Sequence, residues 1–346
     1  MYSFKNLKKK PYIIAEISSN HANKIDIALK TIEAAARAGA DAIKTQLFTP
    51  SSLTIPDRSL SASIKDANSP WDGALLFDLY AKAALPYDWY PQLIKCAESN
   101  SIDIFSSVFD FESVDYLLKF KFPLVKISSF ELIHIPLLKY VEKTNIPTIV
   151  STGMADIKEV DKCVQIFNNN PEKLCLLKCT SDYPAKLNTT HLGQMRSLRE
   201  RYNLPVGLSD HSSSNIPSII ATTLNATVIE KHFILNKNIK SLDSFFSLDE
   251  KEFTSLVNDI RSTKAMLERT NLNKLRQNVE AHSLWERPSI YYSRNLKKGE
   301  NINSDCLLIR RPSLGLHPSN FEDLIGKKMK CNVTKYQPAS FEHILK

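Results

Sequence analysis

The stretches PVGLSDHS (residues 205–212) and ATVIEKHF (226–233) decide the fold of this chain, because each places a short apolar run before polar residues and a histidine. Runs of this kind are typical of parallel strands that are buried on both faces. The same pattern occurs in six further runs, at residues 11–18, 40–48, 102–109, 123–130, 147–153 and 174–180.

Segments with helical spacing lie between these runs, among them residues 25–40, 86–100, 112–120 and 191–202. Eight strand-then-helix units over about 270 residues predict an α/β fold, the (β/α)8 TIM barrel, with the strands inside and the helices outside. A doubly wound sheet is the competing architecture. No GxGxxG motif follows any of the runs, however, and the chain contains only eight glycines.

The pattern changes to short β-like runs with turns beyond residue 280. We therefore predict a catalytic barrel at residues 1–280 and a small β-rich domain at residues 281–346. Residues 51–86 are rich in Ser, Pro and Asp around an aromatic patch. They predict an insertion after the second strand that covers the mouth of the barrel as a lid.

Composition narrows the class of protein. The 346 residues are 43% hydrophobic but contain no run of 18 apolar residues, and no apolar segment follows the charged N-terminus, so we expect a cytoplasmic enzyme without a membrane segment. Six scattered cysteines indicate buried, reduced thiols rather than disulfides. The net charge of +8 is spread along the chain without interleaved aromatics, which indicates a solvated basic surface rather than a nucleic-acid-binding site.

Polar residues stand at the end of every predicted strand. The carboxyl ends of barrel strands meet at one rim, where active sites are built, so we expect these residues to form one site. Two lysines and four serines among them suit a phosphate with an adjoining carboxylate. These six residues are Lys44, Lys126, Ser107, Ser129, Ser151 and Ser209. An alternative pairs each lysine with a rim carboxylate, Glu16 or Glu230. We favour the anionic ligand.

The last two predicted strands end in Ser209, Asp210 and His211, and in Glu230 and His232. A single histidine in a barrel is more often a satisfied core residue. Two imidazoles on adjacent strands instead predict a divalent-metal site with open positions, where the metal acts as a Lewis acid on a carbonyl oxygen.

Seven stretches along the barrel carry a resemblance to a known family. They are AEISSNH (15–21), IKTQ (43–46), KISSFE (126–131), STGM (151–154), LKCTSDYP (177–184), GLSDHS (207–212) and IEKHF (229–233). In this order they resemble the sialic acid synthase family of phosphoenolpyruvate-condensing enzymes. The resemblance implies that C3 of phosphoenolpyruvate attacks the aldehyde carbon of an open-chain N-acetylated amino sugar, that water adds at C2, and that phosphate leaves.

The resemblance also implies roles for the rim residues. The six lysines and serines would hold phosphoenolpyruvate. A metal on His211 and His232, manganese with magnesium or cobalt as alternatives, would polarise the aldehyde oxygen. Glu16 is the candidate for handling the proton of the attacking water, with Glu230 as the alternative base or as a partner that fixes a histidine. The sugar would contact Gln46, Tyr183 and Asp243.

The C-terminal segment resembles the small antifreeze-like (SAF) domain that accompanies this family's barrel. In the family this domain commonly reaches across a homodimer and places an arginine over the partner's active site. That role would fall to Arg311, with Arg310 as the alternative. An arginine there donates well to an acetamido carbonyl.

Four stretches resemble the branch of the family that makes pseudaminic acid: WDGALLFDLY (71–80), LKCTSDYPA (177–185), DSFFSLDEKEF (243–253) and RPSLGLHPSNF (311–321). The resemblance therefore favours pseudaminic acid over sialic or legionaminic acid as the product. Two other hypotheses remain open: a metal-dependent aldolase that releases pyruvate, and a carbohydrate-binding protein whose barrel has lost activity.

Overall fold

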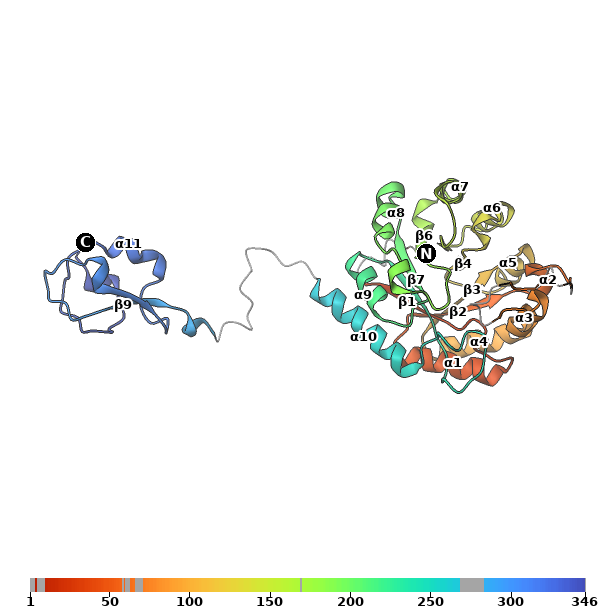
Figure 1. The fold of residues 1–346 in the computed structure, drawn as a ribbon, viewed down its shortest axis with the longest axis horizontal. Helices are drawn as coiled ribbons and strands as arrows, with labels where there is room; N and C mark the ends of the chain where they lie inside the picture. Colours follow the sequence, from red (N-terminus) through yellow and green to blue (C-terminus); the bar gives the residue numbers. More distant parts are fainter. Residues whose placement is uncertain are drawn as a thin grey trace. The chain divides into compact units, whose positions relative to one another are not determined.

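The computed structural model describes residues 4, 10–57, 59, 63–65, 71–168, 170–267 and 283–345. Its first unit, Met1–Glu268, contains eight parallel strands that close a barrel in the order of the sequence (Figure 1). The strands are β1 (Tyr12–Glu16), β2 (Ala42–Leu47), β3 (Asp103–Val108), β4 (Val125–Ile127), β5 (Thr148–Ser151), β6 (Leu174–Cys179), β7 (Val206–Asp210) and β8 (Val228–His232). Each lies within one of the eight predicted runs, so the predicted barrel is confirmed.

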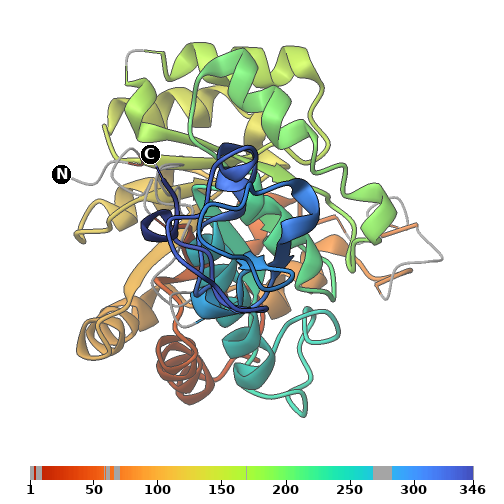
Figure 2. The ribbon, with the colours of Figure 1, turned by 90° about the vertical axis from the view of Figure 1, so that its left-hand side faces the viewer.

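Helices lie outside the strands in both views (Figure 1 and Figure 2). They are α1 (Ile25–Arg37), α4 (Tyr90–Ser99), α5 (Phe111–Leu117), α6 (Ile135–Lys143), α7 (Ile157–Ile166), α8 (Gln194–Tyr202), α9 (Ile216–Thr223) and α10 (Glu250–Met266). The predicted helix at 25–40 is three residues too long, because Gly39 has φ 86° and ends it in the left-handed region. The segment after β2 forms α2 (Pro50–Leu53) and α3 (Leu76–Ala83).

Side chains point alternately outward and inward along each strand, and this alternation separates two hydrophobic cores. Residues that point outward, such as Ile13 and Ile43, pack with the helices in the main hydrophobic cluster. Residues that point inward near the strand starts, such as Ile14 and Phe105, form a second cluster that Phe4 joins. The polar inward positions come later in each strand, so the barrel is apolar at one end and polar at the other.

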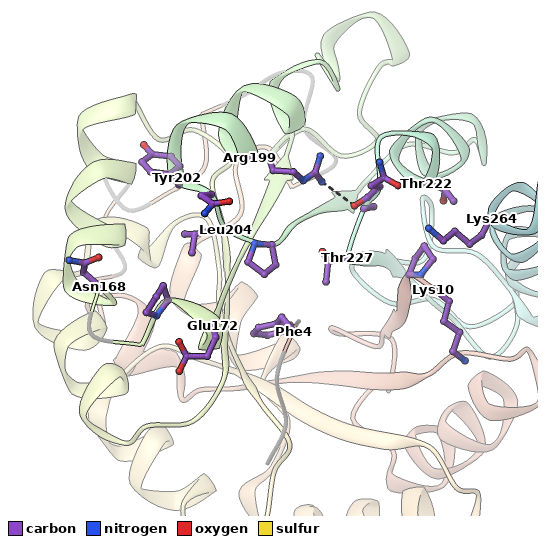
Figure 3. Close-up of a pocket in the computed structure, with 16 residues that line it drawn as sticks. Phe4, Lys10, Asn168, Glu172, Arg199, Tyr202, Leu204, Thr222, Thr227 and Lys264 are labelled. Atoms are coloured by element: carbon purple, nitrogen blue, oxygen red, sulfur yellow. Dashed lines mark hydrogen bonds between the residues drawn. The ribbon is translucent and has the colours of Figure 1, made fainter. Parts of the chain in front are cut away.

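A hollow of about 700 Å³ lies at the apolar end, next to the residues that precede β6, β7 and β8. Figure 3 shows Phe4 and Arg199 among the side chains that line it. Arg199 donates to the backbone oxygens of Leu224 (2.8 Å) and Asn225 (3.0 Å). The arginine thus joins two segments at this end of the barrel, away from the predicted site.

The second unit, Arg269–Lys346, has its own small core, which includes Ile290, Tyr292 and Leu324. It contains the antiparallel strands β9 (Ser289–Tyr292) and β10 (Leu307–Arg310) and the short helix α11 (Phe321–Leu324). Isolated bridges supply its other strand-like pairs. The boundary predicted at residue 280 falls within 268–282, outside the described residues.

The cysteines largely follow the prediction. All six are free, and four of them are buried, at positions 163, 175, 179 and 306. The prediction of buried thiols is wrong for Cys331, which is exposed, and Cys96 is only half-buried. In the described part of the chain, no helix combines the length and apolar character that crossing a membrane requires.

Gly207 lets β7 approach β8 closely. A Cβ atom at this position would lie 2.2 Å from the backbone oxygen of Val228 and 2.7 Å from Cδ2 of Leu177. Both atoms belong to the barrel wall and have little room to move. The glycine therefore sets the position of the strand that carries Ser209 and leads into His211.

We expect Gly207→Ala to lower the free energy of unfolding by about 2–3 kcal/mol, because it overpacks a strand interface. Urea denaturation measures the loss. Gly193→Ala is the matched control, since a Cβ there meets nothing within 4 Å. Equal stability of the two variants would contradict this account of Gly207.

Candidate active site

A cavity of about 690 Å³ opens at the carboxyl ends of the strands. It is lined by every predicted site residue of the first unit: Glu16, Lys44, Gln46, Ser107, Lys126, Ser129, Ser151, Tyr183, Ser209, His211, Glu230, His232 and Asp243. The remaining predicted residue, Arg311, is exposed in the second unit just after β10. The structure thus brings the predicted rim residues together, while the role of Arg311 stays a prediction.

A chain of buried charges crosses the floor of this cavity. The Nζ atom of Lys44 lies 2.9 Å from Oε2 of Glu16 and 3.6 Å from Oε1 of Glu230. The Nζ atom of Lys126 lies 3.8 Å from the same Glu230 oxygen. The pairing of the lysines with Glu16 and Glu230, the alternative that we did not favour, is therefore present, and an anionic ligand for the lysines stays a prediction. The pairing of β1 with β2 sets Glu16 beside Lys44, and buried charges of opposite sign attract strongly when water is absent.

Burial and these ion pairs shift the pKa values of the four groups in different directions. Burial opposes the charge of Lys44, but Glu16 and Glu230 outweigh it and raise its pKa. Burial lowers the pKa of Lys126, and Glu230 offsets this only in part. Burial raises the pKa of Glu16, whereas Lys126 and Lys44 overcome burial and lower the pKa of Glu230. Of the two carboxylates, Glu16 therefore accepts a proton more readily.

The two histidines lie at the ends of neighbouring strands, His211 just after β7 and His232 as the last residue of β8, with ring centroids 5.4 Å apart. Nδ1 of His211 lies 2.8 Å from the backbone oxygen of Thr180, which places the proton on Nδ1 and leaves a lone pair on Nε2. Tyr183 stacks on His211, with centroids 4.3 Å apart, and Phe246 packs against His232 at 4.6 Å. Burial lowers the pKa of both histidines, so both are neutral near pH 7.

These neutral imidazoles fit the donor set that a divalent metal requires. Within the described residues, no group of three or more His, Cys, Asp and Glu side chains is arranged to hold a metal ion. A metal on the two histidines would thus take its other ligands from water and substrate. Glu230 accepts a hydrogen bond from Ser209 (3.1 Å), and none of the described hydrogen bonds joins it to His211 or His232. Direct fixing of a histidine by Glu230 therefore lacks support.

Three of the four serines lie on different strands, β3, β5 and β7, and Ser129 follows β4. Ser107 accepts a hydrogen bond from Lys44 (3.0 Å), and the hydroxyl of Ser129 lies 3.0 Å from that of Ser181. The hydroxyl of Ser151 is buried and has no hydrogen-bond partner among the described residues. A buried hydroxyl of this kind needs a partner such as water, an ion or a ligand.

Gln46 and Asp243, which are predicted to contact the sugar, form hydrogen bonds with residues of β1 and of the loop that follows it. Gln46 donates to Glu16 (2.7 Å) and to Ser18 (3.1 Å). One oxygen of Asp243 accepts hydrogen bonds from the backbone (3.1 Å) and hydroxyl (2.7 Å) of Ser19. These bonds fix the orientation of the amide and of the carboxylate within the cavity.

Glu131 is a titratable residue that the sequence analysis missed. It follows β4 within the quoted stretch KISSFE and lines the cavity, where Ser128 donates a hydrogen bond to it. Burial raises the pKa of Glu131 from 4.5 to about 7, although its own backbone and Lys126 oppose the shift. Its position just beyond a strand end was the signal that could have identified it.

The ionisation of Glu131 gives a pH-dependent stability. Its folded-state pKa lies above the unfolded value, so the neutral carboxyl favours folding at low pH, and this advantage is lost as the pH rises through 7. Relative to Glu131→Gln, the free energy of unfolding of the wild-type protein should fall by about 2 kcal/mol between pH 5 and pH 8. Denaturation curves across this range test it, with exposed Glu112→Gln as control. A constant difference would refute the shift.

A buried ion pair lies behind the histidines on the outer face of the barrel. Nζ of Lys231 lies 2.7 Å from Oδ2 of Asp210 and donates to the backbone oxygens of Ser212 (2.6 Å) and Ser214 (3.0 Å). Asp210 also accepts from Ser218 (3.0 Å). The predicted rim cluster placed Asp210 in the cavity, and this prediction is wrong. Alternation along β7 points Asp210 outward, where it anchors the loop after His211.

We expect Lys231→Met to cost about 3–5 kcal/mol of unfolding free energy, because it leaves Asp210 as a buried charge without its partner. Lys173→Met is the matched control. Lys173 is also buried, but its contacts are the backbone and side-chain oxygens of Asn145, so its loss costs about 1–2 kcal/mol. If both variants unfolded at the same urea concentration, the ion pair of Lys231 would not stabilise the fold more than the contacts of Lys173.

Comparison with known proteins adds three kinds of match. Residues 31–271 match the NeuB family, and residues 287–345 match the SAF domain. The chain is 42% identical over 95% of its length to a pseudaminic acid synthase of Campylobacter jejuni, covering 95% of that protein. It is 30% identical over 96% of its length to an N,N'-diacetyllegionaminic acid synthase of Legionella pneumophila, covering 94% of it.

Solved structures agree with the fold. An N-acetylneuraminic acid synthetase from Leptospira borgpetersenii, crystallised with citrate, matches 80% of this chain and 91% of its own, with a TM-score of 0.69 and 26% identity. The spore coat polysaccharide biosynthesis protein SpsE of Bacillus subtilis matches 97% of this chain and 96% of its own, with a TM-score of 0.63 and 29% identity.

Proposed function

Because the chain belongs to the NeuB family, we propose that it makes pseudaminic acid from phosphoenolpyruvate, water and 2,4-diacetamido-2,4,6-trideoxy-L-altrose, with release of phosphate. The observation that carries this proposal is the 42% identity to a pseudaminic acid synthase along nearly the whole of both chains. The cavity supports it, because its lining combines charged residues that suit a phosphorylated acid with apolar and aromatic residues that suit an acetamido sugar.

Phosphoenolpyruvate binds at the charged floor in this proposal. An anion there gives Lys126 the counter-charge that Glu230 supplies only at 3.8 Å, and it gives the hydroxyl of Ser151 a partner. Charge-assisted hydrogen bonds of this kind are the strong ones. The residues that hold the phosphate and the carboxylate are Lys44, Ser107, Lys126, Ser129, Ser151 and Ser209.

A divalent ion, manganese in our proposal, is held by His211 and His232. When bound, it supplies Lewis-acid polarisation of the aldehyde oxygen of the open-chain sugar. The protein prepares this position by keeping both imidazoles neutral and by holding the ring of His211 through Thr180. The stacked ring of Tyr183 covers one side and limits the access of water.

The reaction joins C3 of phosphoenolpyruvate to the aldehyde carbon, and the aldehyde oxygen takes a proton to become a hydroxyl. Water adds at C2, and cleavage of the bond between C2 and the phosphate oxygen releases phosphate. Glu16 takes the proton of the attacking water, because its raised pKa makes it the better acceptor of the two floor carboxylates. Glu230 stays ionised beside Lys126 and Lys44. The sugar is oriented by Gln46, Tyr183 and Asp243. Arg311 of a second copy in a homodimer completes the site.

The direct test measures phosphate release with manganese, phosphoenolpyruvate and each candidate sugar. We expect release and a nine-carbon product with the diacetamido trideoxy sugar, and little with N-acetylmannosamine. Turnover of N-acetylmannosamine alone would overturn the assignment to pseudaminic acid. Pyruvate release without phosphate would indicate an aldolase.

His232→Asn should lower kcat by roughly 100-fold or more, because it removes a ligand of the metal that would polarise the aldehyde oxygen. The matched control is His191→Asn. His191 is exposed, and its φ of 44° is one that asparagine tolerates. Manganese binding followed by electron paramagnetic resonance supplies an independent readout. Unchanged manganese affinity in His232→Asn would show that the metal does not bind at His232.

A further inference from the structure

Helix α3 turns one apolar face into the cavity. The lining residues of this helix are Leu76, Leu79, Tyr80 and Ala83, which follow the i, i+3, i+4, i+7 spacing of a single helix face. Asp78 and Lys82 are not among the lining residues. The helix therefore offers the ligand three aliphatic side chains and a single hydroxyl, that of Tyr80.

Aromatic rings at the ends of two strands extend this apolar wall. The ring of Phe48, just after β2, lies 6.0 Å from that of Tyr80 and 5.3 Å from that of Phe109, just after β3. Phe48 and Phe109 are both buried and both line the cavity. The wall thus stands over β2 and β3, supported by packing against the barrel.

The wall faces the end of the cavity where the aldehyde reacts. His211 and His232 stand at the ends of β7 and β8. In the closed order of eight strands, β2 is only two positions from β8, whereas β3, which carries Phe109 at its end, is four positions from β7. Strands four positions apart lie on opposite sides of the mouth. A six-carbon open-chain sugar whose aldehyde lies at the histidines therefore extends its far end toward α3.

We propose that the face of α3 with Leu79 at its centre selects the sugar by the methyl group at its far end, C6. This inference rests on the proposed function and adds a determinant of specificity to it. A methyl group removes apolar surface from water when it packs on Leu79. A hydroxyl in the same place loses water, and the hydroxyl of Tyr80 is the one side-chain polar group that α3 presents to it.

The test compares two sugars that differ by one oxygen atom: 2,4-diacetamido-2,4,6-trideoxy-L-altrose and its 6-hydroxy counterpart. With the wild-type protein, we expect kcat/KM to be roughly 10- to 100-fold higher for the 6-deoxy sugar, the range that an apolar pocket achieves against an added hydroxyl. The difference should lie mainly in KM, because C6 is remote from the reacting carbon.

Leu79→Gln places an amide on the wall and should reduce this preference at least fivefold, whereas Leu79→Met should keep it. Ala81→Gln is the matched control, because it adds the same amide to an exposed position of the same helix that does not line the cavity. The ratio of the two kcat/KM values does not depend on the folded fraction of the enzyme. Leu76→Gln provides a second substitution on the same face.

The outcomes separate this inference from the proposed function. Phosphate release with neither sugar would defeat the proposed function itself. Turnover of the 6-deoxy sugar with an unchanged preference in both Leu79→Gln and Leu76→Gln would overturn the role of α3 and leave the proposed function standing. An equal loss of preference in Ala81→Gln would also overturn it, because the effect would not come from the wall.

Discussion

The structure depends on the pairing of four buried charges at one end of the barrel, where Lys44 lies between Glu16 and Glu230, and Lys126 approaches Glu230. Each of these side chains is at most 4% exposed, so each would be costly to bury alone. Their balance of two positive and two negative charges makes a polar floor compatible with an apolar barrel. In the proposed function, a bound anion would add a further partner for the lysines.

The cavity above this floor has two chemically different sides. The side near β7 and β8 carries neutral imidazoles and fixed hydrogen-bonding groups, which suits the polar centre of a reaction. The side above β2 and β3 is apolar and comes from a segment inserted between strand and helix. If these proposals hold, chemistry and substrate choice fall to different elements, and the insertion can vary without disturbing the charged floor.

Local periodicity made the barrel and most of its site predictable. Each apolar run became a strand, and the polar residues at the strand ends came together because parallel strands share a direction. Two features that we did not favour from the sequence come from long-range or face-dependent effects. The pairing of Lys44 with Glu16 follows from the register between β1 and β2, and the outward position of Asp210 follows from alternation along β7. Glu131 was missed because its raised pKa depends on burial by other segments.

The sequence by itself determined the eight strands, their order and the residues at their ends, because strand periodicity and the direction of each run are local properties. It also carried the family resemblance, which the comparisons confirm. Tertiary structure alone decided which charges pair, which nitrogen of His211 carries the proton, and which face of α3 lines the cavity. These depend on distances between residues far apart in the chain, and those distances exist only after the barrel has closed.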